Sequence, residues 1–560
     1  MTVPGWKLAI QKRRAEQAEA IPPEWRLKSI PEFVNANFII GDCGILTPEE
    51  VEITNITDAK VTLSKIASGE LSCVTVTTAF CKRAAVAQQL IKCCTEIFFD
   101  RALARAKELD EHFAKTGKTV GPLHGLPMSF KDSQNIKGID STIGWAGLIG
   151  KPAQENTEGV EIAFSLGAIV YVKTNIPQSL MMSDSYNHVW GQSVNAFNKN
   201  LISGGSSGGE GALLGARGSL VGIGTDIGGS VRIPAVLQGL YGLCPTVGRV
   251  PNPESCKVQQ YLVPPVTGPL TNTISSLETY MEALTESEPW KLDAHLIPIP
   301  WRKDLTLPPE RKLKIAFLVD DGILKPQPPV ERTTLEMMEK FRNHGHEVIE
   351  WDPLSDSTSH PKGYDIWLKC ILADGGVKCR RYCNFVSPAE PLIEGMLVGT
   401  ASDLLSTQER QEAHDIKTRY QLAYLKAWTA SGIDALIMPV QPWVAFPPKA
   451  WVRSKHKCSY TAIWNLLDYT ALTIPASKVD PTLDQIGEEW KAYEGKYRSE
   501  SDEFIYKQYD VELVKNMPVG LQVVTGRFGE EKAVGIAKLI ESFGIKGESE
   551  KVMNGNELKN

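Results

Sequence analysis

The chain reads Ser203-Gly204-Gly205-Ser206-Ser207-Gly208-Gly209-Glu210-Gly211 and then Gly224-Thr225-Asp226-Ile227-Gly228-Gly229-Ser230-Val231-Arg232-Ile233-Pro234-Ala235. An apolar run, Leu220-Val221-Gly222-Ile223, stands between these two glycine-serine clusters. A flexible linker of glycine and serine would lack such a run. The segment is therefore predicted to belong to a folded core, with each cluster leading into a stretch that is compatible with a helix.

Three familiar glycine-rich patterns fit this segment less well. The phosphate-binding loop is absent, because no Gly-Lys-Ser/Thr follows five residues after a glycine. A dinucleotide pattern begins at Gly222-x-Gly224 but has Ile227 where a third glycine belongs. The run from Gly204 to Gly208 does satisfy Gly-x-Ser-x-Gly, which is typical of a nucleophile elbow. That alternative also needs a downstream histidine, and the later ones have no distinctive setting, among them His344, His346, His360, His414 and His456.

Three further stretches extend the pattern along the chain. They are Gly121-Pro122-Leu123-His124-Gly125-Leu126-Pro127-Met128-Ser129-Phe130-Lys131-Asp132, Lys173-Thr174-Asn175-Ile176-Pro177-Gln178-Ser179 and Met517-Pro518-Val519-Gly520-Leu521-Gln522. Together with the two clusters they resemble the amidase signature family over roughly residues 65 to 545. The length and a proline-rich insertion are similar to the fungal acetamidase-like general amidases. One departure is Cys244, where many relatives have lysine, and it lies outside the catalytic positions.

The resemblance implies a catalytic triad. By position, Ser230 matches the acylated nucleophile, Ser206 the cis-peptide serine that relays the proton, and Lys131 the terminal base. It further implies that the N–H groups of Ile227, Gly228, Gly229 and Ser230 form an oxyanion hole. Leu180 falls where relatives bind substrate through the main chain. No metal and no cofactor are expected.

The chemistry explains why such a site would need these residue types. A serine hydroxyl is a weak nucleophile until a base removes its proton. Lysine is a base only when neutral, and its ordinary pKa of about 10.4 must fall by about three units, or roughly 4 kcal/mol, to approach neutrality. Burial without a carboxylate partner can lower it that far. Lys131 follows a strand-like stretch into the interior, and Asp132 is expected to point elsewhere.

Residues around the nucleophile have more ordinary interpretations as well. Asp226 and Arg232 bracket the loop, and we interpret them as a structural ion pair that holds its shape. The stretch from Ser230 to Leu240 could begin a helix whose positive end adds to the oxyanion hole. A set of large side chains could line an acyl pocket or simply belong to the core, namely Met181, Met182, Tyr186 and Trp190.

The alternation of apolar runs with helical patterns predicts an α/β fold. Helix-like 161–166 precedes strand-like 168–172, and a second such series has a strand from 314 to 319, a helix near 332–343 and a strand at 347–349. The resemblance implies a single large core with a mixed twisted β-sheet flanked by helices on both faces. The expected organisation is an N-terminal helical arm (1–65), a catalytic domain (66–545) with a proline-rich insertion near 286–312, and a polar tail (546–560).

Composition narrows the class of partner. The 560 residues carry a formal net charge of −6, which gives no electrostatic case for binding nucleic acid or an anionic membrane. No run of 18 apolar residues suggests a membrane span. Eleven cysteines without zinc-site spacing and the lack of a secretory signal favour free thiols and a cytoplasmic protein. A homodimer is compatible with the sequence, which is otherwise silent on oligomeric state.

The sequence thus favours an amidase that converts a small-molecule carboxamide, R-CO-NH₂, to R-COOH and ammonia through an acyl-enzyme on Ser230. Two alternatives stay open. One is an amidotransferase subunit of the same superfamily, which would need partner subunits and a basic docking face. The other is a non-catalytic binding protein on the same fold. The sequence does not identify the acyl group.

Overall fold

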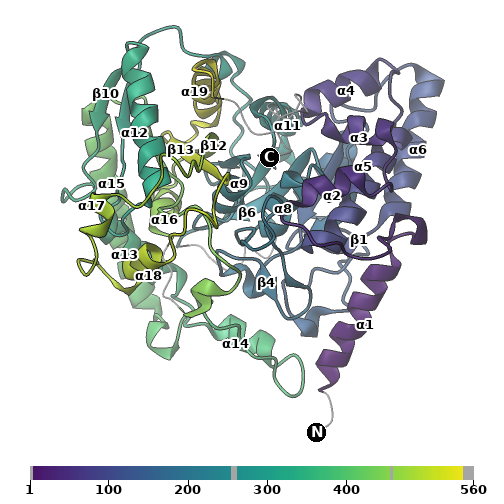
Figure 1. Cartoon of the computed structure of the whole chain (residues 1–560), viewed down its shortest axis with the longest axis horizontal. Helices are drawn as coiled ribbons and strands as arrows, with labels where there is room; N and C mark the ends of the chain where they lie inside the picture. The colour runs from purple at the N-terminus through teal and green to yellow at the C-terminus, as the bar shows by residue number, and fades with distance from the viewer. Residues whose placement is uncertain (1–3, 254–261, 454–457, 546–560) are drawn as a thin grey trace.

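The computed structural model describes residues 4–253, 262–453 and 458–545, and Figure 1 shows the chain. Within these ranges one mixed sheet of eleven strands runs through the molecule in the order β1-β3-β2-β6-β8-β7-β12-β13-β11-β9-β10. Its strands are β1 (Cys94–Ile97), β2 (Pro127–Lys131), β3 (Ile169–Thr174), β6 (Val221–Asp226), β7 (Tyr241–Cys244), β8 (Val266–Thr271), β9 (Lys314–Phe317), β10 (Glu347–Glu350), β11 (Ala435–Pro439), β12 (Ala471–Lys478) and β13 (Pro518–Val524). The short strands β4 (Tyr186–Asn187) and β5 (Gly191–Gln192) pair separately.

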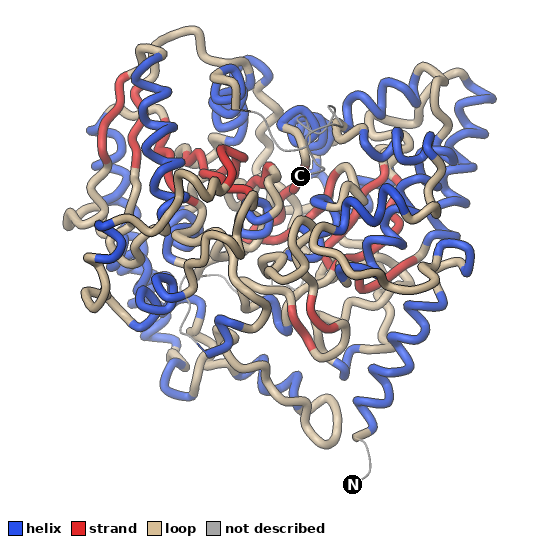
Figure 2. Tube along the Cα trace, viewed as in Figure 1, coloured by secondary structure: helices blue, strands red, loops and turns tan. Residues whose placement is uncertain are grey.

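Helices and connecting loops make up the remaining chain (Figure 2). They are α1 (Gly5–Glu19), α2 (Ala36–Asp42), α3 (Pro48–Asn55), α4 (Ala59–Ala67), α5 (Cys73–Ile91), α6 (Phe99–Thr116), α7 (Glu158–Ser165), α8 (Gly208–Gly215), α9 (Arg232–Leu237), α11 (Ile274–Glu286), α12 (Pro328–Asn343), α13 (His360–Ile371), α14 (Val377–Cys383), α15 (Thr407–Ser431), α16 (Ser459–Leu467), α17 (Glu488–Lys491), α18 (Glu500–Lys507) and α19 (Glu530–Ser542). Single 3₁₀ turns lie at Pro23–Trp25, Ala146–Leu148, Gln178–Leu180, Pro289–Lys291, Lys303–Thr306, Ala401–Asp403 and Ala450–Arg453.

Strand direction explains why the sheet is mixed. Strand β2 runs parallel to β3 and β6, and β9 runs parallel to β10 and β11. The central strands β8, β7, β12 and β13 are antiparallel to their neighbours. The predicted mixed sheet is thereby confirmed.

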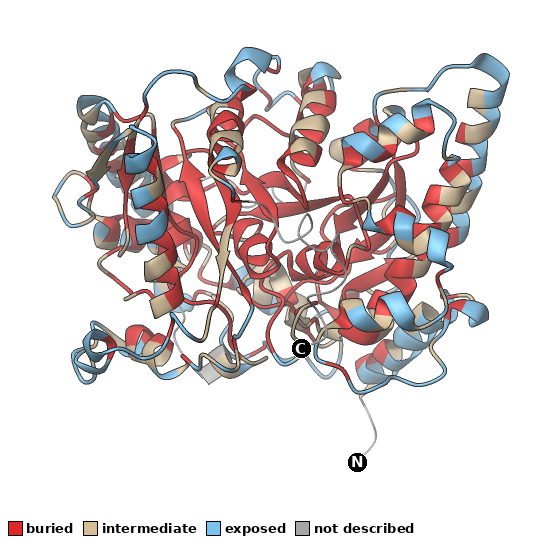
Figure 3. Ribbon diagram, turned by 45° about the horizontal axis from the view of Figure 1, so that its top comes forward, coloured by how far each residue is buried: buried red, intermediate tan, exposed pale blue. Residues whose placement is uncertain are grey.

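Alternation along the strands places helices on both faces of the sheet. Because successive side chains of a strand point to opposite faces, Ile315 and Phe317 pack into one hydrophobic core and Ala316 packs into another. The first core also holds side chains of α5, α11, α12 and α19, and the second holds side chains of α13, α15 and α16. In Figure 3 the buried sheet lies between helices whose outer faces are exposed.

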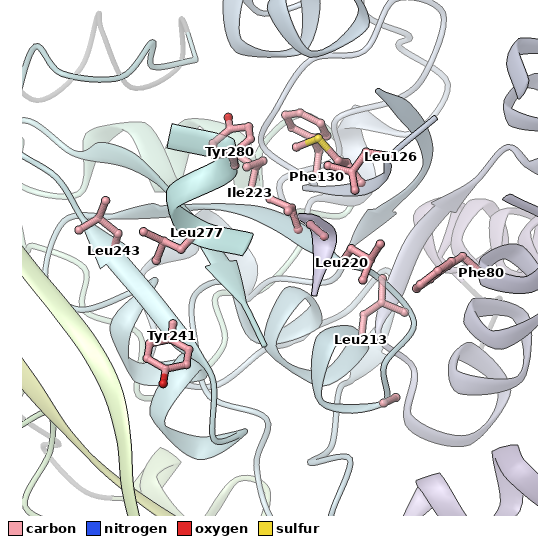
Figure 4. Packing of buried hydrophobic residues seen from close by; sticks show 14 of the residues in the cluster. Phe80, Leu126, Phe130, Leu213, Leu220, Ile223, Tyr241, Leu243, Leu277 and Tyr280 are labelled. Atoms are coloured by element: carbon pink, nitrogen blue, oxygen red, sulfur yellow. The ribbon is translucent and has the colours of Figure 1, made fainter. Parts of the chain in front are cut away.

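The larger core is packed from both the sheet and the helices that cover it. In Figure 4, Phe130 of β2 and Ile223 of β6 lie near Tyr280 of α11, and all three are almost fully buried. Burying an aliphatic or aromatic side chain of this size stabilises the fold by about 1.5–3 kcal/mol. Strands β2 and β6 are thus firmly held, and their carboxyl ends carry the site described below.

Local signals in the sequence account for the ends of the longest helix, α15. Ser406 and Glu409 form a reciprocal capping box at its start, in which each side chain accepts from the other residue's backbone N–H. Gly432 ends it with φ of 66°, a left-handed conformation that glycine adopts without steric penalty.

The N-terminal segment is helical and lies against the edge of the sheet. Trp6 and Ile10 of α1 pack with Val189 and Trp190. Gln17 donates from Nε2 to the carbonyl oxygens of Cys94 and Thr95 at distances of 2.9 and 2.7 Å. The helix therefore covers polar backbone groups of β1, the edge strand, that would otherwise be open to another chain.

Two further expectations concern the chain as a whole. Among the described residues no helix is both long and apolar enough to cross a membrane, and the ten cysteines in the described ranges are free thiols. The tail predicted for 546–560 lies outside the described residues. The division into arm, catalytic domain and insertion stays a prediction.

Candidate active site

Lys131 is the last residue of β2 and is fully buried. Its Nζ donates to Ser206 Oγ at 2.8 Å, to Thr225 Oγ1 at 2.8 Å and to the Thr225 carbonyl at 3.2 Å. The neighbouring carboxylate points elsewhere, as expected: Asp132 accepts from Thr95 Oγ1 and from the Ile143 N–H. The structure therefore brings the predicted lysine and one predicted serine together at the end of the sheet.

Ser206 lies directly before α8 and is almost fully buried. The Gly205–Ser206 peptide bond is cis, and Gly204 has φ of 85°. A β-carbon at position 205 would lie 2.6 Å from the backbone N of Asp184 and the carbonyl O of Met182, so only glycine fits there. This close approach of two backbone segments explains why a glycine pair precedes Ser206.

Ser230 lies in a loop that is held on three sides. Trp367 Nε1 donates to the Ile227 carbonyl at 2.9 Å, and Thr461 Oγ1 donates to the Gly228 carbonyl at 2.5 Å. On the third side the Ser207 N–H donates to the Ser230 carbonyl at 3.1 Å. In a trans peptide the N–H points away from the preceding C=O. The anchored Ile227 carbonyl therefore turns the Gly228 N–H away from Trp367, whereas the N–H groups that follow the other two carbonyls, Gly229 and Val231, donate to Asp226.

Asp226 and Arg232 form the structural ion pair predicted at the base of this loop. Both are fully buried, and Arg232 donates from Nε and Nη2 to the two carboxylate oxygens at 3.1 and 3.0 Å. Asn465 donates to Asp226 and accepts from Arg232, at 3.0 and 2.7 Å. Burial alone would raise the pKa of Asp226, but the guanidinium and these hydrogen bonds hold that pKa well below its usual range.

The Gly229 N–H, one of the four expected oxyanion-hole donors, already has an acceptor within the protein. The Gly229 N–H donates to Asp226 Oδ1 at 2.7 Å, since the loop folds back over the carboxylate. The N–H groups of Ile227, Gly228 and Ser230 donate to no oxygen within the described ranges. The helix after Ser230 is also shorter than anticipated: α9 starts at Arg232, and the Val231 N–H donates to Asp226.

A cavity of about 180 Å³ connects the two predicted catalytic serines. Ser206 and Ser230 both line it, together with Thr225, Ile227 and Leu180. The two serine hydroxyls form no hydrogen bond with each other in the described part of the chain. Leu180 and its neighbour Ser179 have φ values of 66° and 58°, a conformation that costs about 1–3 kcal/mol per non-glycine residue and is frequent at ligand sites.

The predicted acyl-pocket residues divide into two groups. Met181 lines this cavity, and Met182 lines an adjoining one of about 50 Å³ that also reaches Ser230. Tyr186 and Trp190 line neither cavity, and Trp190 packs instead against Trp6 of α1.

Sequence reasoning missed the opposite wall of the cavity. That wall comes from the segment between α13 and α15 and comprises Ile371, Leu372, Asp374, Gly376, Lys378, Cys379, Tyr382, Leu397, Val398 and Gly399. No local motif marks these residues. The one sequence signal nearby is the amphipathic pattern of α13, which ends at Ile371 and predicts a helix with one buried face.

A buried carboxyl group that the sequence reasoning passed over lies on the same face of the sheet as Lys131. Glu210 accepts from Ser129 Oγ at 2.5 Å and from Thr174 Oγ1 at 2.7 Å. Ser129 is two residues before Lys131 on β2, so their side chains share a face. Burial raises the pKa of Glu210 to about 8, against the opposing effects of these hydroxyls and of Lys131.

Comparisons with known proteins show the class of enzyme to which this fold belongs. A family model described as Amidase matches residues 75–534. The chain is 36% identical to an acetamidase of Emericella nidulans over 95% of its length and 97% of the relative's. It is 34% identical to an acetamidase of Aspergillus oryzae over 96% and 98%. Fatty acid amide hydrolase, a solved structure, is 33% identical with a TM-score of 0.87, covering 96% of this chain and 95% of that one.

A bacterial aryl acylamidase, at 18% identity and a TM-score of 0.71 over 87% of this chain and 96% of that one, shares the fold. The chain belongs to the amidase signature family. This confirms the resemblance and the α/β fold read from the sequence, and it supports hydrolase activity.

Proposed function

We propose that this enzyme hydrolyses carboxamides to the carboxylic acid and ammonia through an acyl-enzyme on Ser230. The observation that carries the proposal is the 2.8 Å contact between buried Lys131 Nζ and Ser206 Oγ, since Ser206 lines a cavity that Ser230 also lines. Burial disfavours the ammonium form of an amine. A neutral Lys131 can then take the proton of Ser206 while Ser206 takes that of Ser230.

The first half-reaction follows from this relay. Ser230 Oγ attacks the amide carbon, and its proton passes through Ser206 to Lys131. The N–H groups of Ile227, Gly228 and Ser230 stabilise the oxyanion that develops on the carbonyl oxygen. Lys131 returns the proton through Ser206 to the amide nitrogen, the C–N bond breaks, and ammonia leaves.

In the second half-reaction water replaces the amine. The relay takes a proton from water, the resulting hydroxide oxygen attacks the acyl carbon, and the proton returns to Ser230 Oγ as the ester bond breaks. A contact between the two serine hydroxyls must form when substrate binds, and catalytic hydrogen bonds commonly tighten at that stage.

Substitution of the three relay residues tests the mechanism. Ser230→Ala should abolish turnover of a primary amide, and Lys131→Met and Ser206→Ala should lower kcat by several orders of magnitude. A fluorophosphonate should add mass to Ser230 in the unsubstituted chain and leave the Ser230→Ala chain unmodified. Ser542→Ala, at the exposed end of α19, serves as the control and should keep full activity. Labelling of a different residue in the unsubstituted chain would refute the assignment of the nucleophile.

We further propose that the acyl part is apolar, because the cavity wall includes Ile143, Met181, Ile371 and Leu397. Each methylene moved from water into such a wall contributes about 0.8 kcal/mol, or about fourfold in kcat/KM. Along a series from acetamide to octanamide, kcat/KM should rise until the cavity is full and then level off or fall. A series that falls steadily from acetamide onwards would contradict an apolar acyl site.

A further inference from the structure

A third cavity, of about 610 Å³, lies between α15 and the end of α16. It shares no lining residue with the two cavities at Ser230. Its apolar wall includes Leu422, Leu425 and Trp428 of α15 and Leu467 of α16. Leu422 and Leu425 are 54% and 48% exposed, so their side chains are accessible to a ligand in the cavity.

The wall holds one buried donor without an acceptor, the Tyr469 hydroxyl, and one half-buried ammonium group, that of Lys417. The Tyr469 residue is only 5% exposed, and its hydroxyl has no hydrogen-bond partner in the described ranges. Lys417 Nζ donates to the Leu262 carbonyl at 2.7 Å and has no carboxylate within ion-pair distance among the described residues. A buried hydroxyl left without a partner costs about 1–3 kcal/mol, so an acceptor from a ligand would be favoured here.

The charges around the cavity favour an anion. Asp468 and Arg527 neutralise each other, since Arg527 Nε donates to Asp468 Oδ2 at 2.8 Å. This leaves Lys417 as an excess positive charge in the wall. Burial lowers the pKa of Lys417, and a carboxylate at hydrogen-bond distance would offset that effect. Burial raises the pKa of the Tyr469 hydroxyl to about 12, so it remains a donor at neutral pH.

We propose that this cavity is a binding site for an amphiphilic carboxylate, with the carboxylate on Lys417 and Tyr469 and the aliphatic chain along Leu422, Leu425 and Trp428. The ligand class is that of an aliphatic carboxylic acid. The site is separate from the reaction site, so the proposal stands independently of the proposed function.

The cavity also adjoins the network that holds the Ser230 loop. Asn465 lines it and at the same time bonds Asp226 and Arg232. One turn earlier on the same helix, Thr461 holds the Gly228 carbonyl. A ligand in this cavity would therefore rest on the helix that positions the nucleophile loop.

Calorimetric titration with octanoate tests the site. The unsubstituted chain should bind octanoate, and Lys417→Met and Tyr469→Phe should each weaken that binding by about tenfold, the usual effect of losing a hydrogen bond to a charged group. Lys426→Met, an exposed lysine on the same helix, is the matched control and should bind as the unsubstituted chain does. Tyr469→Phe removes a single oxygen atom, so it keeps the test usable if Lys417→Met does not fold.

The position of the ligand gives a second, independent readout. A crystal grown with 8-bromooctanoate should show an anomalous bromine peak beside Leu422 or Leu425. Three results would overturn the proposal: a bromine peak only in the Ser230 cavity, an unchanged affinity in both cavity variants, or octan-1-ol binding as tightly as octanoate.

Discussion

Asp226 shows how one buried residue can determine the shape of a catalytic loop. Its carboxylate accepts from Arg232, Asn465 and the N–H groups of Gly229 and Val231. Removing the charge of one partner in a buried pair leaves the other charge uncompensated, which costs about 3–5 kcal/mol.

We therefore expect Asp226→Asn to lower the free energy of unfolding by about 3–5 kcal/mol, measured by urea denaturation. The folded-state pKa of Asp226 is depressed, so its contribution is fully present above the unfolded pKa of about 4 and is lost only in strong acid. The difference between variant and parent should thus be the same at pH 6 and pH 9. Asp415→Asn, on the exposed face of α15, should change stability by less than about 0.5 kcal/mol.

His360 is predicted to make stability depend on pH. It is buried among aromatic rings, and burial lowers its pKa to about 3, whereas the unfolded chain titrates near 6.5. Below pH 6.5 the unfolded state binds a proton that the folded state does not. This histidine therefore reduces stability by about 1.4 kcal/mol per pH unit between pH 6.5 and pH 3.

His360→Phe should flatten that slope, as measured by urea unfolding at pH 7.5, 6 and 5. His414→Gln, an exposed histidine on α15, is the control and should keep the parent's slope. An equal slope in parent and His360→Phe would show that His360 is protonated in the folded state.

The roles of single residues could be predicted where they stand in a sequence motif. They could not be predicted where a residue reaches the site only through the fold. Lys131, Ser206 and Ser230 stand in spaced motifs; Ser206 and Ser230 line one cavity, and Lys131 Nζ lies 2.8 Å from Ser206 Oγ. Ile371 and Leu397 line the same cavity but look like any other apolar residue of a helix or loop. Gly229 illustrates a further limit of motifs. The motif predicts an N–H group near the reacting atoms, but it does not show that the Asp226 carboxylate already accepts from that N–H group.

At the scale of elements, α8 depends on glycine for its contact with the sheet. A β-carbon at Gly209 would lie 2.2 Å from the backbone N of Asn175 and 2.4 Å from the carbonyl O of Cys93. Both atoms are backbone and cannot move aside as a side chain can. Since α8 directly follows Ser206, a shift of this helix would also displace the relay.

Gly209→Ala should therefore destabilise the protein by at least 1–3 kcal/mol, the usual range for overpacking, and should lower kcat as well. Thermal unfolding and initial rates would measure the two effects. Gly159→Ala in α7 is the matched control, because a β-carbon there meets nothing within 4 Å. That variant should be stabilised by about 0.5–1 kcal/mol.

Elements with strong local periodicity were predicted well. The strand expected at 314–319, the helix near 332–343 and the strand at 347–349 correspond to β9, α12 and β10. The helix expected from Ser230 to Leu240 is the shorter α9: Asp226 accepts the N–H groups of Val231 and Arg232 at its start, and Gly239, with φ of 64°, follows its end. Contacts of this kind depend on the folded chain, so a short stretch of sequence does not reveal them.

At the scale of the whole molecule, α1 stabilises a distant part of the sheet. Arg13 pairs with Glu96 of the edge strand and with Asp140. Burial raises the pKa of Glu96 to about 8, and Arg13 opposes that effect.

Deletion of residues 1–20 should lower the free energy of unfolding by about 3–6 kcal/mol, since it removes the buried side chains of Trp6 and Ile10 and uncovers the edge of β1. Chemical denaturation would measure the loss, and size-exclusion chromatography would detect association through the open edge. Lys12→Gln, an exposed position on the same helix, should have no measurable effect. A deletion variant as stable as the parent would show that α1 is dispensable.

Sheet order was beyond sequence reasoning. The composition and alternation indicate α/β, and the resemblance implies a mixed sheet, but nothing local places β7 between β8 and β12. Those pairings join strands far apart in sequence, and they depend on which faces the flanking helices cover.

The two sides of the cavity come from separate parts of the sequence, and this has an evolutionary consequence. The proposed reactive groups come from the stretch between Lys131 and Arg232, whereas the facing wall comes from residues 371–399. Mutations in the wall leave the proton relay untouched, so the two can diversify at different rates. Exchange of that wall segment between relatives would change which substrates fit the cavity while the catalytic residues stay the same.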